Sequence, residues 1–91
     1  MATYLVNYDL RKPGRNYDDL LKRLREYPSW CRFLESSWFV VANDVSTSGV
    51  RDELAKYIDS GDGLLVMDAS HDSAAWLGLS STISDWVKQN L

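Results

Sequence analysis

The residues of this chain that could do chemistry are a small set of carboxylates and hydroxyls. Asp9 ends the first apolar stretch, Ser37 begins the third, and Asp62 stands just before the fourth. If these stretches form one antiparallel sheet, the end of the first strand adjoins the turn at Glu35 and Ser36 and the start of the last strand. Oxygen ligands of this kind suit Mg²⁺ or Mn²⁺, and such a metal activates water for phosphodiester hydrolysis. The pattern therefore indicates Asp9 and Asp62 as candidate metal ligands, and Asp9 and Ser37 as candidate catalytic residues.

A structural role for Asp9 is the alternative. Its carboxylate could cap a loop or pair with Arg11, Lys12 or Arg15, which follow it closely in the sequence. One carboxylate per chain is a weak signal for a metal site. The residues alone leave both roles open.

Hydrophobic patterning predicts the elements that position these residues. Residues 3–10 are rich in β-branched, aromatic and aliphatic side chains and are typical of a central strand. Asn16 is a suitable N-cap for a helix that ends at Pro28. Its apolar positions have helical spacing and are Tyr17, Leu20, Leu21, Leu24 and Tyr27. Further strands are expected at residues 30–34, 37–42 and 64–67, and further helices at about residues 50–58 and 82–91.

This order of elements predicts an α+β protein with a ferredoxin-like βαββαβ fold, a two-layer sandwich. The core covers residues 1–70, and residues 71–91 form a C-terminal extension whose helix opens on a capping box of Thr82 and Asp85. Two helices cover one face of the sheet, so the extension or a partner subunit must cover the other. We expect Trp76 and Trp38 at a dimer interface. Whether residues 74–78 add a strand within the chain or across a dimer stays open.

Composition and charge narrow the function. The net charge is −3, and proteins that bind nucleic acid without sequence preference usually present a basic face. A local contact with nucleic acid through Arg11, Lys12 and Arg15 stays open, but the negative net charge disfavours a dedicated DNA-binding protein. The apolar runs are shorter than the roughly 18–20 residues of a membrane helix, the N-terminal residues do not resemble a secretory signal, and a single cysteine fits a reducing compartment. We therefore expect a cytoplasmic protein without a membrane segment.

Several short motifs resemble the Cas-two family, the small subunit of the CRISPR-associated adaptation complex. They are the strand ending Tyr8-Asp9-Leu10, the run Ser37-Trp38-Phe39 that opens the third strand, and Asp62 before Leu64-Leu65-Val66. This resemblance covers about the first 70 residues. The chain looks closer still to the SinR-like group of such proteins, through Tyr8-Asp9-Leu10, Lys12-Pro13-Gly14, Ala74-Ala75-Trp76 and Trp86-Val87-Lys88. Related VapD-like ribonucleases share the fold that the resemblance implies.

The resemblance implies a ferredoxin-like homodimer in which Asp9 lies near the two-fold axis and shares a divalent metal with its mate. Val40 stands where many members of the family carry an acidic residue. Two functions follow from the resemblance. The first is a non-catalytic homodimer that binds or scaffolds a partner in a prokaryotic defence or mobile-element system. The second is a Mg²⁺-dependent endonuclease, acting on RNA or DNA, with Asp9 of both subunits at the metal.

Overall fold

A computed structural model describes residues 1–12 and 16–91 as a mixed α+β protein. The predicted turn at residues 13–14 and the candidate nucleic-acid contact Arg15 lie outside the described residues. The elements follow the chain in the order β1 (Ala2–Asp9), α1 (Asp18–Arg25), β2 (Ser29–Leu34), β3 (Ser37–Ala42), α2 (Thr47–Ala55), β4 (Gly63–Asp68) and α3 (Ser81–Asn90).

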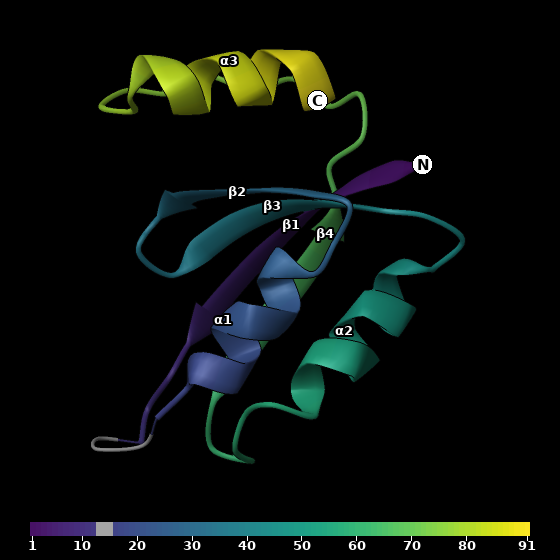
Figure 1. The fold of residues 1–91 in the computed structure, drawn as a ribbon, viewed down its shortest axis with the longest axis vertical. Coiled ribbons are helices and arrows are strands. Elements are labelled where there is room, and N and C mark those ends of the chain that lie inside the picture. Colours follow the sequence, from purple (N-terminus) through teal and green to yellow (C-terminus); the bar gives the residue numbers. More distant parts are fainter. Residues whose placement is uncertain (13–15) are drawn as a thin grey trace.

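The strands of the described residues form one antiparallel sheet in the order β2-β3-β1-β4. Strand β1 is central, as its composition predicts, and β4 forms one border of the sheet. Helices α1 and α2 lie against one face, and α3 lies across the opposite face (Figure 1). None of the described helices is long and apolar enough to cross a membrane.

The core lies between the sheet and the helices α1 and α2. Because side chains alternate along a strand, Tyr4, Val6 and Tyr8 of β1 face these helices. Thr3, Leu5, Asn7 and Asp9 lie on the opposite face, of which α3 covers a part. The predicted helix face is largely correct, since Leu20 and Leu24 are fully buried. Residues that share the core include Trp38 and Val40 of β3 and Val50 and Leu54 of α2.

Helix α3 covers only part of the second face of the sheet. The indole of Trp86 stacks on Phe39, with ring centroids 6.1 Å apart, and its Nε1 donates to Ser29 Oγ at 3.0 Å. At the other end of the helix, Thr3 Oγ1 donates to the carbonyl of Asn90 at 2.6 Å. The extension thus supplies a layer over β2, β3 and the start of β1 that a two-layer sandwich lacks.

The border of the second face near β4 stays open. Leu65 and Met67 alternate with Leu64 and Val66, which pack against the core. Their side chains are 49% and 50% exposed, and Leu5 of β1 pairs with Met67 in the sheet register. We call Leu5, Leu65 and Met67 the open sheet patch.

Some boundaries differ from the prediction. Helix α2 begins at Thr47 instead of Val50, because the Ser46 side chain accepts the backbone N–H of Gly49 and caps it. Helix α3 likewise begins at Ser81, where Ser80 caps the N–H of Ile83 instead of the expected box at Thr82. Residues 74–78 form no strand, so they neither extend this sheet nor pair within the chain.

Candidate functional site

Asp9 lies at the last position of β1, opposite Gly63 of β4. Its carboxylate Oδ2 accepts a hydrogen bond from Arg11 Nε at 2.8 Å, and the two side chains are 69% and 60% exposed. The position belongs to the face of the sheet that also carries the open sheet patch. The pairing with Arg11 is the structural alternative that the sequence left open. Because the Asp9 side chain is exposed, its carboxylate remains accessible from solvent.

Asp62 accepts hydrogen bonds from two residues that are distant in sequence and from one residue of its own turn. Its Oδ1 accepts the backbone N–H of Arg11 at 2.7 Å, and its Oδ2 accepts the hydroxyl of Tyr17 and the backbone N–H of Asp59, both at 2.8 Å. Partial burial, together with the neighbouring carboxylates of Asp62 and Asp59, raises the pKa of the Tyr17 phenol. A metal ion at Asp62 would compete with these hydrogen bonds for the carboxylate oxygens.

We expect Asp62→Ala to lower the free energy of unfolding by about 1–3 kcal/mol, because it removes hydrogen bonds to a charged, half-buried acceptor. Asp9→Ala is the matched control and should change it by less than about 1 kcal/mol, since exposed ion pairs contribute little. Urea denaturation of both variants measures the difference. Equal losses in the two variants would show that Asp62 does not hold the loop together.

Ser37 lies beside Asn7, its register partner in β1. Its side chain is 5% exposed, and its Oγ accepts Asn7 Nδ2 at 3.0 Å. The Ser36 carbonyl accepts the backbone N–H of Tyr8 at 3.1 Å. The structure therefore brings the hairpin turn, Asp9 and Asp62 to one end of the sheet, while the Ser37 hydroxyl is engaged by Asn7.

The basic residues of this end are engaged by nearby oxygen atoms. Arg11 contacts Asp9 and also donates Nη1 to the carbonyl of Gly61 at 3.3 Å. Lys12 Nζ lies 3.8 Å from a carboxylate oxygen of Asp59. The carboxylates of Asp9 and Asp59 thus balance the charges of Arg11 and Lys12, so these two side chains do not form an unopposed basic surface.

The two tryptophans expected at an interface have different environments. Trp38 is 1% exposed and lies in the core of its own chain, so it has no surface left for a partner, and that expectation is wrong. Trp76 is 38% exposed, and its Nε1 donates to Ser84 Oγ of α3 at 3.0 Å. Trp76 therefore retains surface that a partner can contact.

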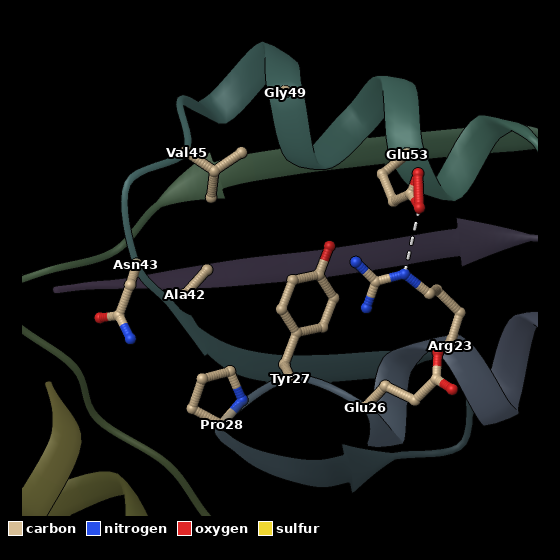
Figure 2. Close-up of a pocket in the computed structure, with 9 residues that line it drawn as sticks. All are labelled: Arg23, Glu26, Tyr27, Pro28, Ala42, Asn43, Val45, Gly49 and Glu53. Atoms are coloured by element: carbon tan, nitrogen blue, oxygen red, sulfur yellow. Dashed lines mark hydrogen bonds and ion pairs between the residues drawn. The ribbon is translucent and has the colours of Figure 1, made fainter.

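A hollow that the sequence did not reveal lies between the end of α1, the end of β3 and the start of α2 (Figure 2). Its volume is about 410 Å³. Arg23 lies over the ring of Tyr27, 4.5 Å from its centroid, and donates Nε to Glu53 at 3.2 Å. Lys56 contacts the other oxygen of Glu53 at 2.8 Å, and hydrogen bonds from Lys56 and Arg23 lower the Glu53 pKa. The Arg23–Glu53 pair links α1 to α2 beside the hollow.

Among residues 1–12 and 16–91, no three His, Cys, Asp or Glu side chains are grouped closely enough to hold a metal ion. Comparisons of the chain with protein-family models, with curated proteins and with solved structures found no match.

Proposed function

We propose that this chain is a non-catalytic homodimer that binds or scaffolds a partner, similar to the Cas-two-like proteins of prokaryotic defence or mobile-element systems. The observation that carries the proposal is the open sheet patch. Large apolar side chains lie together there on a sheet face whose other part is covered by α3. Apolar side chains that lie together on an uncovered sheet face form a surface that a protein partner can bury.

The arrangement of the elements supports the ferredoxin-like part of this proposal. Residues 2–68 run β-α-β-β-α-β, with sheet order β2-β3-β1-β4 and both intervening helices on one face. Such a layout exposes the second face unless an extension or a second subunit covers it. Helix α3 covers one part, and the open sheet patch is left for the second subunit.

The contacts of the candidate site favour a non-catalytic role. The Asp9 carboxylate is paired with Arg11, the Asp62 oxygens accept three hydrogen bonds, and the Ser37 hydroxyl is held by Asn7. A catalytic carboxylate must bind a metal or move a proton, and these protein contacts compete with a metal or a substrate for the same side chains.

One observation keeps a Mg²⁺-dependent endonuclease as the second candidate. Asp9 is 69% exposed on the same face of the sheet as the open sheet patch, so a subunit seated on that face can bring a second Asp9 towards the first. Mg²⁺ or Mn²⁺ held by the two carboxylates would activate water for attack on a phosphodiester.

Cleavage assays separate the two functions. We expect no cleavage of single- or double-stranded RNA or DNA in Mg²⁺, Mn²⁺ or EDTA, and no difference between wild type and Asp9→Asn. The variant is nearly isosteric and keeps an oxygen that can accept from Arg11. Metal-dependent cleavage by wild type that Asp9→Asn abolishes would instead establish the endonuclease and assign Asp9 as a metal ligand.

A further inference from the structure

Strand β4 presents unpaired backbone groups at the border of the sheet. Within the described sheet, β4 has β1 as its neighbour on one side only. The backbone N–H of Ala69 donates to the carbonyl of Thr3 at 2.8 Å, which identifies this pair as a hydrogen-bonded one. Because such pairs alternate along an antiparallel ladder, the N–H and C=O groups of Leu64, Val66 and Asp68 point away from β1.

We propose that two copies of the chain join through their β4 strands, antiparallel, about a two-fold axis at Val66. This inference deepens the homodimer proposed above and rests on it. Because Asp9 lies opposite Gly63, three residues from Val66 and one strand further in, this axis keeps the two Asp9 carboxylates apart and supports the non-catalytic candidate over a shared metal site. Val66 then faces Val66 of the second copy, and Leu64 faces Asp68. In this register each of the three outward-pointing residues pairs with an outward-pointing residue of the second copy. If the register moves by two residues, one of the three has no such partner. The two sheets become one continuous sheet.

The side chains are self-complementary in this register. Residues opposite each other in an antiparallel pair point to the same face, so Leu65 meets Met67 of the second copy on the open face. Two such pairs bring the apolar side chains of both β4 strands together. A second copy therefore fits this border, because the two-fold axis makes each pair on one strand occur again on the other.

The helix face of the border offers room and complementary charge. A hollow of about 420 Å³ lies beside Val66 and is lined by Ser46, Thr47, Ser48 and Arg51 of the α2 region. Asp68 is exposed on this face, and hydrogen bonds from Ser70 lower its pKa. In the joined sheet, Asp68 of one copy is a diagonal neighbour of Val66 in the other copy. The long Arg51 side chain of that other copy lies beside its Val66 and can reach this Asp68. Each Arg51 also keeps its own Asp52 at 2.9 Å, which limits repulsion between the two guanidinium groups.

Cysteine pairs test the register. In a Cys31→Ala background, Leu65→Cys and Met67→Cys are prepared separately, oxidised alone and as a mixture, and resolved on a non-reducing gel. The proposed register places positions 65 and 67 of different copies in a non-hydrogen-bonded pair, about 4.5 Å apart between Cα atoms, which suits a disulfide. We expect a cross-linked dimer in the mixture and little in either variant alone.

Light scattering of the reduced samples separates failure of this inference from failure of the homodimer. A dimer mass without cross-linking in the mixture, or with equal cross-linking of each variant alone, overturns the β4 contact and leaves the homodimer standing. A monomer mass for wild type and for both variants overturns both.

Discussion

Replacing Trp38 by alanine is expected to lower the free energy of unfolding by about 3–5 kcal/mol, as for large aromatic side chains removed from a core. Trp38 is 1% exposed, and its Nε1 donates to the Tyr8 hydroxyl at 3.0 Å. The substitution leaves a cavity between β3 and the helices and removes the hydrogen-bond donor of a buried hydroxyl. Small domains are stable by only about 5–15 kcal/mol, so thermal unfolding should move to a much lower temperature.

Trp30→Ala is the matched control for this experiment. The Trp30 ring contacts that of Trp38, with centroids 5.3 Å apart, but it lies on the border strand β2 and is 40% exposed. Replacing Trp30 should therefore lower the free energy of unfolding by less than replacing Trp38. Circular dichroism during heating measures the thermal stability of both variants. Equal losses of stability would contradict the assignment of Trp38 to the core.

The arrangement of the core was largely predictable from the sequence because it depends on local periodicity. Leu20 and Leu24 have helical spacing, and the structure buries both. In β3 the run from Ser37 to Ala42 is apolar at nearly every position, so alternation could not tell which residues face the helices. For this reason the sequence predicts an interface position for Trp38, whereas the structure buries its side chain in the core.

The environment of the candidate site was less predictable because it depends on long-range contacts. The sequence correctly placed Asp9 and Asp62 at one end of the sheet. It could not show that Asp62 accepts hydrogen bonds from Arg11 and Tyr17, which are 51 and 45 residues away in the chain. The position of α3 was equally hidden, since Trp86 reaches Ser29 across 57 residues.

Replacing Met67 by lysine is expected to dissociate the homodimer. Met67 is 50% exposed in one chain, and covering part of this surface against Leu65 of the second copy contributes up to about 1 kcal/mol per copy. Two copies lose this contribution together, and each lysine also brings a charge that must be desolvated. Since 1.4 kcal/mol corresponds to a factor of ten in affinity, the dissociation constant should rise by at least about tenfold. Lysine on a border strand also opposes strand pairing directly.

Light scattering of wild type, Met67→Lys and Leu77→Lys over a concentration series tests the homodimer most directly. Leu77 is 94% exposed and lies outside the sheet, so its variant controls for the added charge. We predict about twice the 10.4 kDa chain mass for wild type and for Leu77→Lys. Met67→Lys should approach the mass of one chain at concentrations where the other two remain dimers. A wild-type chain that stays monomeric, or a Met67→Lys variant as dimeric as wild type, would contradict a dimer built on the open sheet patch.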